Sequence, residues 1–116
     1  MNIETLHTYC LAKKGVEESF PFGEDTLVFK VGGKIFLLTG LNSSPLQFNV
    51  KCHSEKAIEW REQYEAVQPG YHMNKKHWNT VVVDGSIPNK VIQQMIDDSY
   101  ELVVQSLPKS IRDTIV

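Results

Sequence analysis

Hydrophobic and polar residues alternate most regularly between residues 46 and 51. The apolar positions are Leu46, Phe48 and Val50, and the polar positions between them are Gln47, Asn49 and Lys51. Successive side chains of an extended chain point to opposite faces, so this pattern predicts a strand with one buried and one solvated face. Such a strand is typical of an antiparallel sheet that is covered on one side only.

Two glycines separate two further apolar segments and predict a β-hairpin. In residues 26–31 the apolar side chains of Leu27, Phe29 and Val31 fall on one face, and Gly32-Gly33 follows directly. Glycine readily adopts the positive φ angles that a two-residue hairpin turn requires. We therefore expect paired strands over residues 26–31 and 34–39.

Apolar residues recur at helical spacing in three segments of the chain. Residues 2–13 form the first predicted helix, and Ser54 is expected to cap the second. A long helix is expected over residues 88–107, because Pro88 suits a first turn and Pro108 interrupts the pattern before a short terminal helix. The second helix is expected to turn Ala57, Ile58, Arg61 and Tyr64 inward, and the long helix Val91, Ile92, Met95, Ile96, Ser99, Leu102 and Val103.

Two more strands are expected, a short one within residues 66–72 that Pro69-Gly70 interrupts and another over residues 78–83. The strands thus follow one another in meanders instead of alternating with helices. We therefore predict an α+β fold in a single domain, residues 1–116. It has an antiparallel sheet of about five strands, with the 2–13 and 88–107 helices packed on one face.

Charge is nearly balanced along the 116 residues, with 12 Lys and Arg against 14 Asp and Glu and a net charge of −2. This balance argues against a general electrostatic attraction to nucleic acid or to an anionic membrane, but it permits a local basic patch. We see no signal segment and no apolar run near the roughly 20 residues of a membrane span, so we expect a cytoplasmic protein without membrane contact. Cys10 and Cys52 are expected to be reduced core residues.

Several motifs resemble one known family. They are Phe20-Pro21-Phe22-Gly23, Val28-Phe29-Lys30-Val31 with Gly33-Lys34, Leu46 to Cys52, Pro69 to Val81, and Ser99 to Val103. In this order they resemble the MmcQ/YjbR family over nearly the whole chain, and Lys75 to Trp78 is the most specific part. The resemblance implies a frataxin-like fold, and it implies DNA binding, because members of the family are often described as DNA-binding.

The densest cluster of polar and aromatic residues is Lys75-Lys76-His77-Trp78. Its two lysines can contact phosphates, and Trp78 or Tyr71 can offer a flat ring for stacking. His77 would add a positive charge below about pH 6.5, where a free imidazole is protonated. The alternative is a polar turn that enters a strand, with Trp78 anchored in the core and His77 bonded to the backbone.

Lysines on the expected polar face of the sheet extend this hypothesis. Lys30 and Lys51 would join Lys75 and Lys76 in one basic strip if the strand order brings them together. Otherwise these lysines and the neighbouring amide side chains belong to an ordinary solvated face.

Other kinds of chemistry have little support in the sequence. Cys52-His53 and the pair His72 and His77 lack the spacing of structural zinc sites, and the first helix lacks an acidic ridge for iron, so we expect no metal or cofactor. Asp97 and Glu101 share one exposed helix side and are interpreted as solvated. The serines lack a nucleophile-elbow motif, so we expect no enzymatic activity.

Three functions remain open. The first is weak, sequence-indifferent DNA binding through Lys75 to Trp78 together with Lys30 and Lys51. The second is a protein-interaction or regulatory module that uses the polar sheet face or an edge strand. The third is an enzyme or small-ligand binder with an unrecognised site, which a closed and partly apolar pocket would favour.

Overall fold

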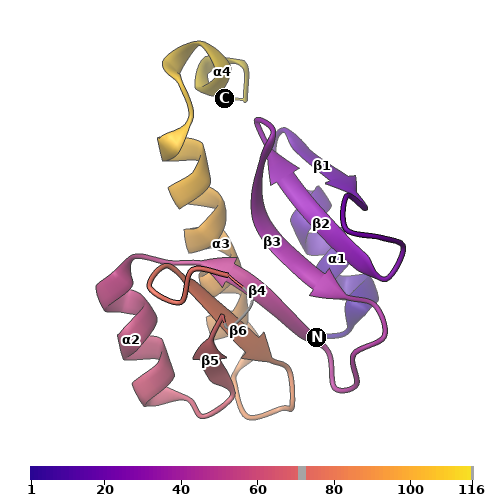
Figure 1. Ribbon diagram of the computed structural model, residues 1–116, viewed down its shortest axis with the longest axis vertical. Helices are drawn as coiled ribbons and strands as arrows, with labels where there is room; N and C mark the ends of the chain where they lie inside the picture. Colours follow the sequence, from indigo (N-terminus) through magenta and orange to yellow (C-terminus); the bar gives the residue numbers. More distant parts are fainter. Residues whose placement is uncertain (71–72, 116) are drawn as a thin grey trace.

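The computed structural model describes residues 1–70 and 73–115 and contains an antiparallel sheet flanked by helices (Figure 1). The elements in chain order are α1 (Ile3–Leu11), β1 (Val16–Ser19), β2 (Thr26–Val31), β3 (Lys34–Gly40), β4 (Gln47–Lys51), α2 (Ser54–Gln63), β5 (Val67–Pro69), β6 (Trp78–Val82), α3 (Asn89–Ser106) and α4 (Lys109–Ile115). The six strands lie in the order β1-β2-β3-β4-β6-β5, and every neighbouring pair is antiparallel. The predicted α+β fold is therefore confirmed.

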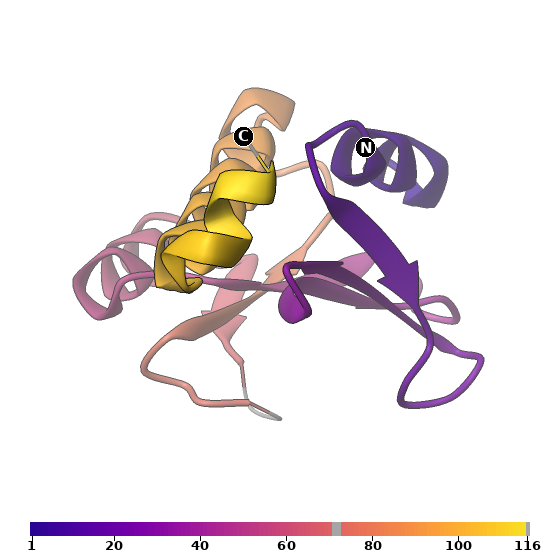
Figure 2. The same cartoon turned by 90° about the horizontal axis from the view of Figure 1, so that it is seen from above.

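Helices α1 and α3 cover one face of the sheet, as predicted (Figure 2). Leu6 of α1 and Ile96 of α3 are fully buried in the same core as Phe29 of β2 and Phe48 of β4. No helix in the described part of the chain covers the opposite face. Residues 20–25 and 73–77 project on that uncovered side (Figure 2).

The edge strand β1 was not predicted from the sequence. Its four residues, Val-Glu-Glu-Ser, contain two glutamates, which have a low preference for strands, and a single apolar side chain. The strand forms because β2 offers it a free edge, with Val16 opposite Val31 and Glu18 opposite Phe29. The neighbour in space, and not the local sequence, therefore determines this element.

The predicted hairpin between β2 and β3 is confirmed. Gly32 and Gly33 have φ angles of 58° and 81°, the positive values that the turn requires. Gly32 has a second reason to be glycine, because a Cβ atom there would lie 2.6 Å from Cδ1 of Leu107. The turn thus also allows the end of α3 to approach the sheet closely.

Ser99 of α3 links β3 to β4 where their own pairing ends. The two strands pair only from Thr39 and Phe48 to Leu37 and Val50. Beyond that point the fully buried Ser99 hydroxyl donates to the carbonyl of Phe36 at 2.5 Å and accepts from the amide of Lys51 at 2.8 Å. A helix side chain thus supplies the next link between the strands and fixes the backbone of Lys51.

The Asp97 side chain is 41% exposed, but it is not simply solvated as the sequence suggested, because it makes specific contacts with α1 and with Lys13 beyond its end. Its carboxylate accepts a hydrogen bond from the Tyr9 hydroxyl at 2.7 Å. It also forms an ion pair with the Lys13 ammonium at 2.5 Å. The Lys13 ammonium also lies 4.8 Å from the Tyr9 ring centre and 5.3 Å from that of Tyr100. Burial, followed by the contact with Asp97, raises the pKa of Tyr9 to about 12. Asp97 therefore joins α3 to α1.

Helix α2 packs beside β5 and β6, and its predicted inward side is confirmed in part, because Tyr64 packs against the core as expected. Ala57 is fully buried as expected, but the Ile58 side chain is 50% exposed. The helix is oriented by Asn79, whose amide donates to the Ala57 carbonyl at 3.2 Å, and by the inward ring of Trp60. The predicted Ser54 cap is also wrong, because His53 occupies the N-cap position without a side-chain hydrogen bond.

Candidate nucleic-acid interface

The sheet face opposite α1 and α3 is referred to as the open face. Asn79 points toward α2, so its neighbours Trp78 and Thr80 point to the open face. Thr80 donates a hydrogen bond to the side chain of Asn49 there, at 2.6 Å. The open face includes Lys30, Leu38, Gln47, Asn49, Lys51, Trp78, Thr80 and Val82. The polar side predicted for β4 is therefore the side that no described helix covers.

The strand register places Lys51 next to the segment Lys75 to Trp78, which is referred to as the cationic turn. Lys51 lies directly opposite Trp78, and the amide of Cys52 donates to the His77 carbonyl at 2.7 Å. The exposed Lys75 and Lys76 precede this pair in the chain. The structure thus brings Lys51, Lys75, Lys76, His77 and Trp78 to one end of the open face.

A side chain in the turn itself holds this cluster in shape. The carboxamide oxygen of Asn74 accepts from the amide of Lys76 at 3.0 Å. Its backbone carbonyl accepts from the amides of His77 and Trp78 at 3.1 and 2.9 Å. Asparagine commonly closes turns in this way. The lysines therefore project from a hydrogen-bonded turn.

Lys30 lies apart from the cluster. It is on β2, and β3 separates it from β4. Glu17 of β1 stands directly opposite Lys30 and provides a negative charge beside it. The register therefore does not place Lys30 in one strip with the cluster of Lys51, Lys75 and Lys76.

Acidic residues are distributed very unevenly over the elements. No Asp or Glu occurs in residues 26–54 or 66–83, which contain strands β2 to β6 in full. The carboxylates of the sheet are those of Glu17 and Glu18 on β1, at its edge. A chain with a net charge of −2 thus has five strands without a negative side chain.

Trp78 is positioned for surface contact and is not a core anchor. Its side chain is partly exposed on the open face and does not belong to the hydrophobic core of the described residues. A Cβ atom at Gly70 would lie 3.0 Å from Cβ of Trp78. Glycine at that position lets β5 approach the strand that carries the indole.

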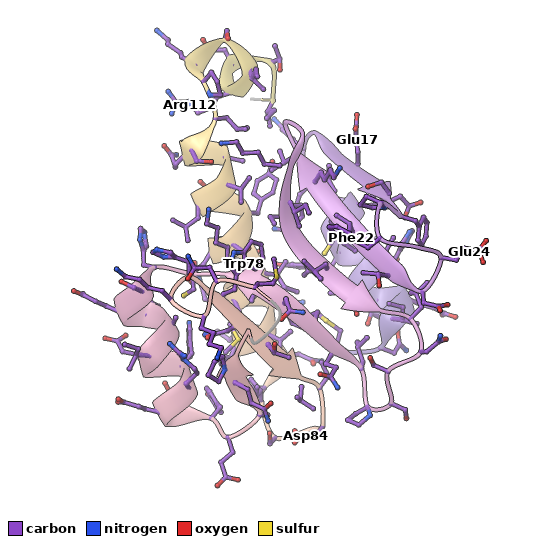
Figure 3. All side chains as sticks on the ribbon, in the orientation of Figure 1. Glu17, Phe22, Glu24, Trp78, Asp84 and Arg112 are labelled. Carbon is purple, nitrogen blue, oxygen red and sulfur yellow. The ribbon has the colours of Figure 1, made fainter. Side chains whose placement is uncertain are left out.

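Two exposed phenylalanines on the same side of the sheet were not predicted as site residues. Phe20 is 49% and Phe22 is 66% exposed. Figure 3 labels Phe22 over the sheet, in the loop between β1 and β2. Nothing in the sequence of Phe20-Pro21-Phe22-Gly23 indicates that its phenylalanines are exposed, and the motif contributed only to the resemblance to the family. His53, exposed after β4, is a further group near the cationic turn.

Metal-binding and nucleophilic groups do not converge in the described residues. No group of three or more His, Cys, Asp or Glu side chains is gathered there, and His72 lies outside the described residues. Cys10 and Cys52 are both buried without a disulfide. Burial raises the pKa of Cys52 to about 11, so its thiol stays protonated and poorly nucleophilic near neutral pH.

A shallow hollow of about 300 Å³ lies between α2 and α3. Its lining residues are Cys52, His53, Lys56, Asp98, Glu101, Leu102 and Gln105. The charged groups on its rim have both signs, so it favours neither an anion nor a cation. None of the helices in the described ranges is long and apolar enough to cross a membrane.

Two curated relatives cover nearly all of this chain. Uncharacterized protein YbdF of Escherichia coli O157:H7 is 40% identical over 107 residues, which cover 91% of this chain and 87% of YbdF. Uncharacterized protein YjbR of Escherichia coli K12 is 34% identical over 116 residues, which cover 100% of this chain and 98% of YjbR. Neither name states a ligand or an activity, so DNA binding stays a prediction.

Solved structures agree with these relatives. The crystal structure of Deinococcus radiodurans protein DR2400, with domain DUF419, superposes on this chain with a TM-score of 0.93 at 34% sequence identity. The match covers 98% of this chain and 87% of the DR2400 chain. A crystal structure of a Pseudomonas syringae protein has a TM-score of 0.75 at 27% identity, and the match covers 89% of this chain and 99% of that protein's chain. The likeness to frataxin stays a prediction. A family model described as YjbR matches residues 11–102, and the chain therefore belongs to the YjbR family.

Proposed function

We propose that this domain is a non-enzymatic module that binds DNA weakly and without sequence preference, through the cluster Lys51, Lys75, Lys76, His77 and Trp78. The observation that carries the proposal is the absence of Asp and Glu from strands β2 to β6, next to an exposed lysine pair. A polyanion approaching the open face at the β4–β6 end meets positive and neutral groups. Carboxylates border it on the far side, on β1 and at Glu24 and Asp25 in the loop that follows β1.

The number of lysines sets the expected strength of binding. Three lysines lie in the cluster, and Lys30 can add a fourth contact only to a ligand that spans β3. Neutralising two to four phosphates gives a slope of roughly −2 to −4 in a plot of log affinity against log salt. Lysine contacts phosphate as a point charge, so affinity should be nearly independent of base sequence.

The proposal is tested by fluorescence anisotropy with a short labelled DNA duplex, from about 50 mM to about 200 mM salt. The double variant Lys75→Ala, Lys76→Ala should flatten the slope by about 2. The control Lys90→Ala, Lys109→Ala removes the same net charge from exposed positions on α3 and α4. It should leave the slope nearly unchanged.

Two results would contradict the proposal. The wild-type protein would show no binding even at low salt, or the control pair would weaken binding as much as the lysine pair in the turn. The second result would mean that net charge, and not the open face, governs the affinity.

A second candidate function is protein interaction through the same face. The observation that favours it is the partial exposure of Leu38 and Val82 between the polar side chains of the open face. This candidate takes first place if the wild-type protein does not bind DNA at low salt.

A further inference from the structure

We infer that the preferred ligand of the open face is a single-stranded nucleic acid whose bases stack on Phe20, Phe22 and Trp78. This inference rests on the proposed function and specifies the form of the polymer. It follows from three aromatic residues that stay partly or largely exposed and that phosphate contacts do not explain.

The two phenylalanines are displayed by a well-defined turn. The amide of Gly23 donates to the Phe20 carbonyl and the amide of Thr26 to the Gly23 carbonyl, both at 3.3 Å. The amide of Leu41 then donates to the Asp25 carbonyl at 2.7 Å and ties the loop to the end of β3. The rings of Phe20 and Phe22 are thus held outward although burial would stabilise the fold, which is typical of a contact surface.

The third ring stands toward the other side of the same face. Trp78 lies on β6, with β3 and β4 between it and β2, which continues from the phenylalanine loop. Between the rings lie Gln47 and the hydrogen-bonded pair Asn49 and Thr80, whose side chains can donate to and accept from base edges. The loop of residues 20–25 projects on the side of the sheet away from α1 and α3 (Figure 2), and Figure 3 labels Phe22 and Trp78 in front of the sheet on that side.

This arrangement fits an unpaired strand better than a duplex. In a duplex the bases are paired and stacked inside, so Phe20 and Phe22 would have no ring to contact. Glu24 and Asp25 follow Phe22 in the same loop, and their exposed carboxylates would repel a phosphate backbone there. An unpaired strand can place its bases on the phenylalanines and its phosphates along the lysines of the β4–β6 end.

Stacking also supplies affinity that the few lysines do not. A base stacked on an aromatic side chain contributes about 5- to 150-fold in affinity, and every base can take part. Binding would therefore remain independent of sequence while it becomes selective for unpaired strands. Residual binding at higher salt should come mainly from the rings.

The experiment compares labelled oligothymidylate and oligouridylate of about 15 nucleotides with a duplex of equal length, by anisotropy at matched salt. Both single strands should bind more tightly than the duplex, and their ratio distinguishes DNA from RNA as the source. Phe22→Ala should weaken single-strand binding by about 5- to 150-fold and leave duplex binding unchanged. Ile58→Ala, which truncates a 50% exposed apolar side chain on α2, is the matched control and should change neither.

Tryptophan emission provides an independent readout. In the variant Trp60→Phe, Trp78 is the remaining tryptophan, and oligothymidylate should quench its fluorescence while the duplex should not. Circular dichroism of each variant should match the wild-type protein, which separates loss of stacking from loss of fold.

Three results would overturn the inference, and they differ in what they leave standing. Equal affinity for duplex and single strands, unaffected by Phe22→Ala, would refute stacking and keep the proposed function. No binding of any of the polymers at low salt would refute both. A wild-type dimer in light scattering that Phe22→Ala dissociates would show that the rings contact a second copy of the chain.

Discussion

Replacing Ser99 with alanine tests how the two halves of the sheet are joined. The hydroxyl connects the Phe36 carbonyl to the Lys51 amide at a point where β3 and β4 no longer pair. Ser99→Ala removes both hydrogen bonds and leaves a donor and an acceptor without partners inside the protein. Each such group costs about 1–3 kcal/mol, and alanine regains about 0.5 kcal/mol in helix propensity. The free energy of unfolding should therefore fall by about 1.5–5.5 kcal/mol.

Urea denaturation followed by circular dichroism measures this change, with the slope against urea expected to stay constant. The matched control is Ser106→Ala on the same helix, where an exposed hydroxyl bonds the Val103 carbonyl within its own turn. Its cost should stay within about 0.5 kcal/mol. Hydrogen exchange should also show that the Lys51 amide loses protection in Ser99→Ala. Equal costs for the two serines, with an unchanged Lys51 amide, would refute the role assigned to Ser99.

Other contacts lead to further predictions. Phe48→Ala, at a fully buried ring, should cost about 3–5 kcal/mol in chemical denaturation, and Gln47→Ala on the open face within about 0.5 kcal/mol; equal costs would mean that both faces are covered. Asp97→Ala breaks the partly exposed contact between α3 and α1 and should lower the free energy of unfolding by about 1 kcal/mol. An unchanged free energy of unfolding would mean that these contacts do not stabilise the fold. Burial raises the pKa of the Cys52 thiol above its unfolded value, so its stabilising contribution is complete below about pH 9 and is lost as the pH rises through about 11. Wild-type protein should therefore lose stability in this alkaline window more steeply than Cys52→Ala, and parallel curves would contradict the burial of the thiol.

Local patterns were sufficient to predict most of the sheet. The alternation around Phe48 and the glycine pair at Gly32 encode strand, face and turn within a few residues. Strand β1 and the role of Ser99 depend instead on contacts between segments that are distant in the chain, so no local sequence pattern predicts them. The orientation of α2 likewise depends on a bond from Asn79, 22 residues away from Ala57.

The candidate site was predicted in part for the same reason. Lys75 to Trp78 stands out in the sequence as a dense cluster, and its neighbour Lys51 follows from the alternation of β4. The separation of Lys30 requires the strand order, and the exposure of Phe22 requires the loop geometry. The absence of Asp and Glu from residues 26–54 and 66–83 is visible in the chain. Only the strand order shows that these residues form adjacent strands, and therefore a continuous part of the sheet without carboxylates.

Chemical-shift mapping of isotope-labelled protein during titration with a short DNA duplex at low salt tests the central claim most directly. The claim is that the open face binds nucleic acid at its β4–β6 end. Amide shifts should be largest at Lys51, Lys76 and Trp78, and they should shrink as salt is added. Shifts confined to α1 and α3, or no shifts at all, would contradict the account.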